Sequence, residues 1–151
     1  MQPVEDQDGS TLRYVLSSRP EAVRETLGDI RNALIQRGVR AEKLGPCELV
    51  LAEAMNNIVE HAYKDADNGE IRITLSLDAT HLKARIEDSG GMMPQSSLPT
   101  GEMKSVDVAL ADLPEGGFGW FLIRSMTDEL RYRRKDGINL LDFSIPIKDA
   151  D

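Results

Sequence analysis

The sequence contains little cysteine, few aromatic residues and no long apolar run. Cys47 is the one cysteine in 151 residues, so no disulfide can form within the chain, and we expect a cytoplasmic location. No stretch approaches the roughly 20 apolar residues that a membrane-spanning helix needs. Basic residues are outnumbered by acidic ones, 18 to 26, which gives a net charge of −8. Because nucleic-acid binding depends on clustered Lys and Arg, we expect neither nucleic acid nor membrane as a direct partner.

The length and the composition fit one globular domain. A chain of 151 residues, 40% of them hydrophobic, can bury one core of ordinary size but not two. The first ten residues, MQPVEDQDGS, are polar and acidic and do not have the character of a secretory signal. We therefore predict a flexible tail over residues 1–10, a folded domain over residues 11–147 and a second tail over residues 148–151.

The first strand and the first helix are predicted from spacing and turn residues. TLRYVLSS alternates large apolar residues with smaller or polar ones, which is typical of a strand. Ser18, Pro20 and Glu21 then match a capping box with a proline in the first turn. We expect the helix that begins there to end at Gly38.

The remaining elements are a second helix, two hairpins and a short third helix. The second helix is expected from about Pro46 to Tyr63. EIRITLSL and HLKARIED predict one hairpin, joined by the turn DAT, and FGWFLIRSMTD predicts the short helix. ELRYRRK and INLLDFSIPI predict the second hairpin, because Asp136-Gly137 is a favourable turn pair between them.

A long stretch without periodicity separates the two hairpins. Residues 91–116 contain Pro94, Pro99 and Pro114, which prevent a long helix. A connection of this length is typical of a lid over a binding site, and a disordered surface insertion is the alternative.

The second predicted helix carries polar residues that its packing does not require. Within LAEAMNNIVEHAY the helical spacing predicts a core face of Leu51, Met55, Ile58 and Ala62. Glu53 and Asn57 lie four residues apart on another face. From periodicity alone, the simplest interpretation is that both are exposed to solvent. An amide oxygen and a carboxylate at this spacing are also what a Mg²⁺ site and a general base would use.

Two glycine-containing segments follow this helix. IEDSGG ends a predicted strand with an aspartate, and EGGFGWFLI places three glycines before an apolar helix. Glycine lets the backbone approach a ligand closely, and the free N–H groups at a helix N-terminus attract phosphate. A glycine turn before a helix is common by itself. The order of all three segments is much more specific.

In this order, EAMNNIVEHAY, EDSGG and GGFGWFLIRSMTDELRY resemble the N box and the two glycine boxes of the anti-sigma factor serine/threonine kinases. These are small members of the GHKL, or histidine-kinase-like, ATPase superfamily. The resemblance covers residues 11–147. It implies an α/β sandwich with the Bergerat-type ATP-binding fold, in which a mixed, mainly antiparallel sheet carries helices on one face.

The resemblance also implies roles for single residues. Glu53 would be the general base, and Asn57 would coordinate Mg²⁺. Asp88 would accept a hydrogen bond from the adenine amino group of ATP, and Gly90 would leave room for the ring.

The second glycine box would contact the phosphates. Gly117 and Gly119 would let the backbone approach them. Closure of the predicted lid around ATP would bring Lys104 within reach of the terminal phosphate. Met92 departs from the family pattern, in which a glycine is common at that position, and this departure puts the nucleotide affinity in doubt.

The function implied is an ATP-dependent kinase that phosphorylates a Ser or Thr of a STAS-type anti-sigma factor antagonist. A sigma factor is the second partner that the resemblance suggests, and a homodimer is left open. The alternative is a nucleotide-dependent binding module that sequesters a sigma factor or another regulator with little or no chemistry. Glu53 favours the enzyme, because a binder needs no carboxylate there. The catalytic half of a sensor histidine kinase is disfavoured, because no histidine precedes His61.

Overall fold

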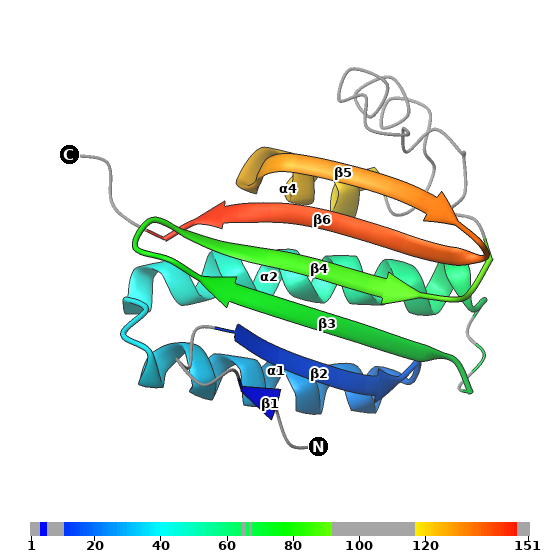
Figure 1. Ribbon diagram of the computed structural model, residues 1–151, viewed down its shortest axis with the longest axis horizontal. Helices are drawn as coiled ribbons and strands as arrows, with labels where there is room; N and C mark the ends of the chain where they lie inside the picture. The colour runs from blue at the N-terminus through cyan, green and yellow to red at the C-terminus, as the bar shows by residue number, and fades with distance from the viewer. Residues whose placement is uncertain (1–3, 6–10, 65, 67, 92–116, 148–151) are drawn as a thin grey trace.

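The protein is an antiparallel sheet with helices packed on one of its faces (Figure 1). The computed structural model describes residues 4–5, 11–64, 66, 68–91 and 117–147. The strands are β1 (Val4–Glu5), β2 (Thr11–Ser17), β3 (Glu70–Leu77), β4 (His81–Asp88), β5 (Asp128–Lys135) and β6 (Ile138–Pro146). The helices are α1 (Pro20–Gln36), α2 (Ala41–Asn57), a π-helical turn η1 (Ile58–Ala62) and α4 (Gly117–Met126).

The sheet confirms the predicted fold class. Its strand order is β1-β2-β3-β4-β6-β5, and every pairing between the described strands is antiparallel. Alternate residues of the central strands are buried, such as Leu12, Tyr14 and Leu16 on β2. They pack under α1, α2 and α4, while the other face of the sheet carries no helix (Figure 1). This alternation is expected of an antiparallel sheet with one solvated face.

The start of α1 differs from the prediction. The helix begins at Pro20 as expected, but its N-cap is Arg19, and no side chain caps it. The predicted capping box is therefore wrong. The Ser18 hydroxyl accepts a hydrogen bond from the Gly69 N–H instead, at 3.0 Å, so it holds the chain just before β3. The predicted end is confirmed, because Gly38 has a φ of +87° and terminates the helix in the left-handed conformation.

Helix α2 begins five residues earlier than predicted. The expected start at Pro46 is wrong, since the helix runs from Ala41 with Pro46 inside it. Proline in a helix costs a backbone hydrogen bond. Leu44 and Cys47 are both buried on the core side, and this packing favours the helical conformation despite the proline. After Asn57 the chain continues as the π-helical turn η1, which ends just before the predicted limit at Tyr63.

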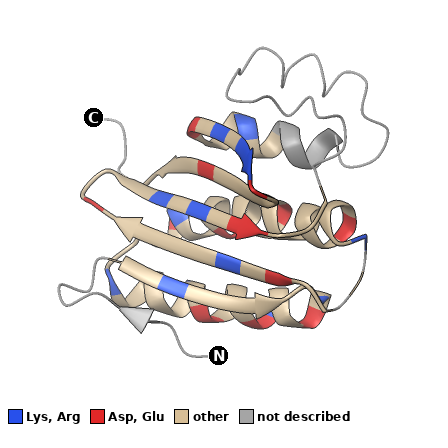
Figure 2. Ribbon diagram, turned by 45° about the vertical axis from the view of Figure 1, so that its right-hand side comes forward, with Lys and Arg blue, Asp and Glu red and all other residues tan. Residues whose placement is uncertain are grey.

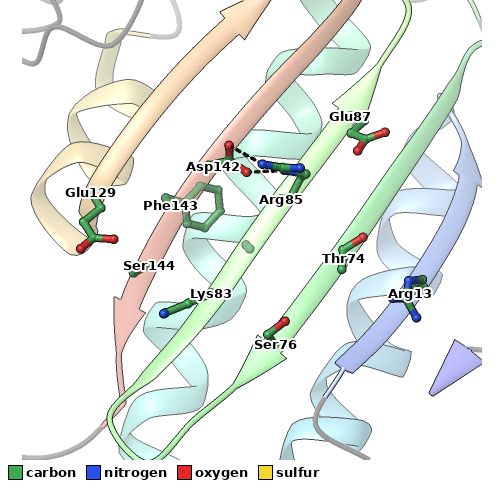
Figure 3. Close-up of a pocket in the computed structure, with 11 residues that line it drawn as sticks. Arg13, Thr74, Ser76, Lys83, Arg85, Glu87, Glu129, Asp142, Phe143 and Ser144 are labelled. Atoms are coloured by element: carbon green, nitrogen blue, oxygen red, sulfur yellow. Dashed lines mark hydrogen bonds and ion pairs between the residues drawn. The ribbon is translucent and has the colours of Figure 1, made fainter. Parts of the chain in front are cut away.

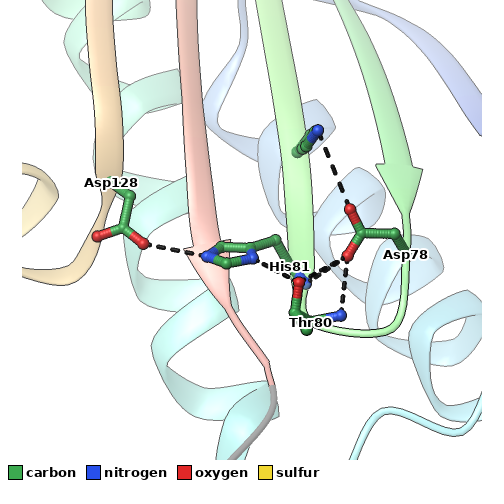
Figure 4. Close-up of polar contacts among 5 residues, drawn as sticks. Asp78, Thr80, His81 and Asp128 are labelled. Carbon is green, nitrogen blue, oxygen red and sulfur yellow. Dashed lines mark hydrogen bonds and ion pairs between the residues drawn. The ribbon is translucent and has the colours of Figure 1, made fainter.

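Both predicted hairpins are present. The β5–β6 turn has Asp136 at φ 54° and Gly137 at φ 79°, the left-handed pair that a two-residue turn of this type requires. The β3–β4 turn is organised by Asp78, whose Oδ1 accepts from the backbone N–H groups of Thr80 and His81, each at 2.8 Å (Figure 4). These hydrogen bonds lower the pKa of the Asp78 carboxyl.

His81 ties this turn to the start of β5. Its Nε2 lies 3.0 Å from Asp128 Oδ2, and its Nδ1 lies 2.8 Å from the Thr80 hydroxyl (Figure 4). Asp128 lies two residues after the end of α4, so the contact fixes the chain after that helix against the β3–β4 hairpin.

The predicted N-terminal tail and the predicted lid differ in how much of them the structure describes. Val4 and Glu5, within the predicted N-terminal tail, pair with Arg13 and Leu12 as the short strand β1. The predicted lid, apart from Gly91, lies outside the described residues, and so does Lys104.

Among the helices that the structure describes, none has the length and apolar character needed to cross a membrane.

Candidate functional site

The polar face of α2 is only partly exposed to solvent. Asn57 is 3% exposed, and its Nδ2 has no hydrogen-bond partner within the described part of the chain. Its neighbour Asn56 is exposed. Glu53, one helical turn before Asn57, is half-buried, and no described group forms a hydrogen bond or an ion pair with it. The solvent-exposed interpretation is therefore wrong for Asn57. This face presents a carboxylate and an amide nitrogen that form no hydrogen bond with the described residues.

The π-helical turn joins this helix to the end of β4. Tyr63 N–H donates to the carbonyl of Ile58, five residues earlier, at 3.0 Å. Such turns are frequent at functional sites, because they change which backbone groups a helix leaves free. Here the Ala62 carbonyl accepts a hydrogen bond of 2.7 Å from Gly91 N–H. The predicted N box and first glycine box are thus bonded to each other directly.

Gly90 has a steric role in this junction. A Cβ placed on Gly90 would lie 2.5 Å from the Ala62 carbonyl oxygen and 2.8 Å from its Cβ. No side chain fits in that space, because real Cβ contacts are not that short. The room that the glycine leaves is taken by Ala62. Room for an adenine ring, the role that the resemblance implies, stays a prediction.

Asp88 ends β4 as a buried carboxylate, 4% exposed. Its Oδ1 accepts hydrogen bonds from Gly90 N–H at 2.9 Å and from Asn139 Nδ2 at 2.8 Å. Burial raises the pKa of this carboxyl, while the two hydrogen bonds and the nearby Arg134 guanidinium lower it. No hydrogen bond to Oδ2 is found within the described residues, so this oxygen can accept one from a ligand.

The structure adds a tyrosine that the sequence patterns did not single out. The Tyr63 hydroxyl donates to the Glu70 carbonyl at 2.6 Å and accepts from Ser89 N–H at 2.9 Å. Gly69 packs under its ring, since a Cβ there would lie 2.5 Å from a ring carbon. Tyr63 thereby connects the end of the N box to β3 and to the residue after Asp88. Its place at the end of the polar helix was the available signal.

A second addition comes from the β5–β6 hairpin. Asn139 is paired directly with Asp88 in the β4–β6 register, and it is 2% exposed. Tyr132 and Arg134 hydrogen-bond to it from the neighbouring strand. A polar residue at a buried position of the apolar segment INLLDF was the signal that could have identified Asn139.

The structure describes only the backbone of the two glycines in the second glycine box. Gly117 and Gly119 lie in the first turn of α4, which begins at Gly117 and so includes glycines that the sequence placed before the helix. Helix α4 packs beside α2. The N-terminus of α4 is therefore placed on the helical side of the sheet, the side on which Asn57 and Asp88 are buried. The phosphate contacts of these glycines stay a prediction.

One hollow in the described part of the chain lies away from Asn57 and Asp88. It has a volume of about 400 Å³ and occupies the helix-free face, where Lys83, Arg85 and Asp142 line it (Figure 3). Arg85 forms a two-point ion pair with Asp142, at 2.7 and 3.2 Å, so the charges are matched within the sheet. Charged residues of both signs mark the strands in Figure 2. This pattern is typical of a solvated sheet face.

A smaller hollow of about 310 Å³ borders Asp88 and Ser89 at the end of β4. Glu70, Arg72 and Glu87 also line it, and all three lie on strand positions facing away from the helices. Arg72 is ion-paired with Glu70 at 2.6 Å, which leaves Glu87 to repel a triphosphate. We therefore do not assign nucleotide binding to this hollow.

The fold is an α/β sandwich, because helices cover one face of an antiparallel sheet. A buried Asp-x-Gly at a strand end, bonded to a helix with polar residues, is the arrangement expected of a nucleotide-binding member of this class. The chain belongs to the histidine kinase-like ATPase domain family, whose profile matches residues 16–145. The predicted superfamily is confirmed, and with it the use of ATP by this class of domain.

Named relatives agree with this assignment. The serine-protein kinase RsbW of Oceanobacillus iheyensis is 30% identical over 129 residues, which covers 82% of this chain and 79% of that protein. The serine-protein kinase RsbW of Bacillus mycoides is 29% identical over 121 residues, covering 79% and 72%. The predicted kinase class matches the name of these relatives.

A solved structure supports the fold. The crystal structure of the RsbU and RsbW domains of Rv1364c from Mycobacterium tuberculosis matches with a TM-score of 0.62, at 17% identity. The match covers 93% of this chain but only 33% of that longer chain. It therefore bears on the architecture of this domain alone.

Proposed function

We propose that this protein is an ATP-dependent serine/threonine kinase that phosphorylates a Ser or Thr of a STAS-type anti-sigma factor antagonist. One observation carries the proposal: one helical turn after Glu53 lies the buried amide of Asn57, and its Nδ2 has no hydrogen-bond partner among the described residues. The Glu53 carboxylate likewise forms no hydrogen bond or ion pair with a described group. The family and the relatives' shared name support a catalytic use for the pair and favour it over the binding-module alternative.

Asp88 and its glycines would bind the base. The free Oδ2 of Asp88 is suited to accept the amino group of adenine, because Oδ1 is already hydrogen-bonded. Gly90 and Gly91 hold this strand end against Ala62, so the carboxylate is attached to the same rigid junction as Asn57. Gly117 and Gly119 would offer the N–H groups of α4 to the phosphates.

Asn57 is suited to hold Mg²⁺ through its amide oxygen. The described residues contain no group of three His, Cys, Asp or Glu side chains that could enclose a metal ion. Mg²⁺ at a nucleotide commonly takes one or two protein oxygens and fills its other positions with water and phosphate oxygens. A single amide fits this requirement, and Asn57 Nδ2 forms no hydrogen bond within the described part of the chain that would explain the buried amide. Bound Mg²⁺ would offset charge on the phosphates.

Glu53 would accept the proton of the substrate hydroxyl. It is half-buried and bonded to no described group, so its carboxylate is available on the face that carries Asn57. A positioned general base within reach of the hydroxyl is the usual contribution of a protein to this step, with the phosphates held in line. A cytoplasmic antagonist protein is the proposed substrate, a sigma factor is the second proposed partner, and residues 91–116 are the proposed lid.

Nucleotide titration tests the binding half of this proposal. ADP and ATP would be titrated by calorimetry with and without Mg²⁺, and we expect Mg²⁺ to strengthen binding to the wild type. Asn57→Ala should remove the Mg²⁺ dependence. Asn56→Ala, a change of the adjacent exposed amide, is the matched control and should leave it intact. No binding at millimolar nucleotide, or an Asn57→Ala variant that keeps its full response to Mg²⁺, would contradict the proposal.

A further inference from the structure

The β5–β6 hairpin delivers three polar side chains to the end of β4. Asn139 Nδ2 donates to Asp88 Oδ1 at 2.8 Å and to the Gly91 carbonyl at 2.9 Å. Its Oδ1 accepts from the Tyr132 hydroxyl at 2.6 Å and from Arg134 Nη1 at 2.8 Å. Asn139 and Asp88 are 51 positions apart in the sequence, and the sheet brings them together.

The Asn139 amide has no hydrogen-bonding capacity left. An asparagine side chain offers two N–H donors and two acceptor lone pairs, and all four are used here. Its orientation is therefore determined by its partners, since a flipped amide would turn its NH₂ group toward the donors of Tyr132 and Arg134. The NH₂ group is held toward Asp88.

Arg134 also fixes the turn that follows Asp88. The same Nη1 that contacts Asn139 donates to the Gly90 carbonyl at 3.0 Å. With the Asn139–Gly91 contact, both glycine carbonyls after Asp88 are bonded to the hairpin. The position of the carboxylate and the direction of its hydrogen bonds are thus set by β5 and β6.

We propose that Asn139, oriented by Tyr132 and Arg134, is a positioning group that makes the base site specific for an amino donor. The hydrogen bonds that Asn139 Nδ2 and Gly90 N–H donate to Oδ1 favour the ionised carboxylate, in which the other oxygen is also an acceptor. That oxygen then pairs with the 6-amino group of adenine and repels the 6-oxo group of hypoxanthine or guanine. The inference rests on the proposed function, in which Asp88 contacts the base.

Base selectivity tests this role. The dissociation constants of ADP and of inosine diphosphate, which carries an oxo group in place of the amino group, would be measured for the wild type and three variants. We expect the wild type to prefer ADP by about ten-fold or more, the effect of a good hydrogen bond to a charged group. Asn139→Leu should weaken ADP binding by a similar factor and leave the inosine nucleotide little changed, so the preference collapses.

Tyr132→Phe and Arg134→Gln each remove one donor to Asn139 and should reduce the preference part of the way. Arg133→Gln is the matched control, because Arg133 is the adjacent arginine but contacts Asp142 on the other face. Thermal melting would verify folding, and Tyr132→Phe decides the question if Asn139→Leu does not fold.

A merely structural role for Asn139 would weaken both nucleotides equally and leave their ratio unchanged. An unchanged ratio in Asn139→Leu, or in Tyr132→Phe where Asn139→Leu does not fold, would overturn this inference alone. A wild type that binds neither nucleotide would overturn the proposed function and this inference together.

Discussion

Replacement of Gly90 by alanine tests the junction between the helix and the strand end. The new Cβ would lie 2.5 Å from the Ala62 carbonyl oxygen and 2.7 Å from its carbonyl carbon. Both are backbone atoms of the π-helical turn, so no side-chain rotation can relieve the overlap. Ordinary contact begins near 3.4 Å, so the two segments must separate by about 1 Å. That separation would break the 2.7 Å hydrogen bond from Gly91 to Ala62.

The expected loss of stability follows from these two costs. Overpacking of a tight interior site costs about 1–3 kcal/mol, and a lost backbone hydrogen bond costs about 1 kcal/mol. Together they predict a loss of about 2–4 kcal/mol in the free energy of unfolding. For a domain of this size, roughly 2–4 °C of Tm corresponds to each kcal/mol, so Tm should fall by roughly 5–15 °C.

Calorimetric and circular-dichroism melting would measure the change. Gly91→Ala is the matched control, because its Cβ would meet Ala62 at 3.5 Å, an ordinary contact. We expect that control to melt within about 2 °C of the wild type, as a substitution without a specific destabilising mechanism should. The reasoning would be refuted if both variants melted alike, or if Gly90→Ala kept the wild-type Tm.

Three further predictions concern stability. Gly28→Ala should raise the free energy of unfolding by about 0.5–1 kcal/mol in a denaturant titration, because Gly28 lies within α1 with nothing near its Cβ position. Asn57→Leu should leave stability unchanged or raise it while nucleotide binding loses its Mg²⁺ response, because the buried amide lacks a partner; a large loss of Tm would show that the amide is structural. Asp88→Asn should raise Tm at neutral pH, because burial raises the pKa of Asp88 and the ionised form therefore destabilises the fold. That gain should vanish as pH falls below the carboxyl pKa in the unfolded chain, where Asp88 is protonated in both states, and a gain that persisted in acid would contradict the assignment.

Most of the fold followed from local sequence. The alternation in β2, β3, β4 and β6 and the Asp136-Gly137 turn are local features, so the sheet and its hairpins could be predicted. The start of α2 could not, because Pro46 is a strong local signal that tertiary packing of Leu44 overrides. The predicted capping role of Ser18 was wrong for a related reason, since its hydroxyl hydrogen-bonds to Gly69, a residue 51 positions away.

In the candidate site, too, local features could be predicted and long-range contacts could not. Glu53, Asn57 and Asp88 stand in contiguous motifs, so the order of the motifs and the family resemblance made them candidates. The partners of Asp88 could not be identified, because its pairing with Asn139 depends on the register between β4 and β6. Local spacing says which face a residue lies on, but strand register decides which distant residue it meets.

Transfer of the γ-phosphate tests the central claim most directly. The protein would be incubated with γ-labelled ATP, Mg²⁺ and a purified STAS-type antagonist, and the phosphorylated residue would be identified by mass spectrometry. We expect phosphoserine or phosphothreonine on the antagonist. Transfer should be lost in Glu53→Gln, which keeps nucleotide binding, and retained in Glu60→Gln, where the exposed carboxylate nearby on η1 is changed. ATP binding without any transfer, or full transfer by Glu53→Gln, would contradict the account.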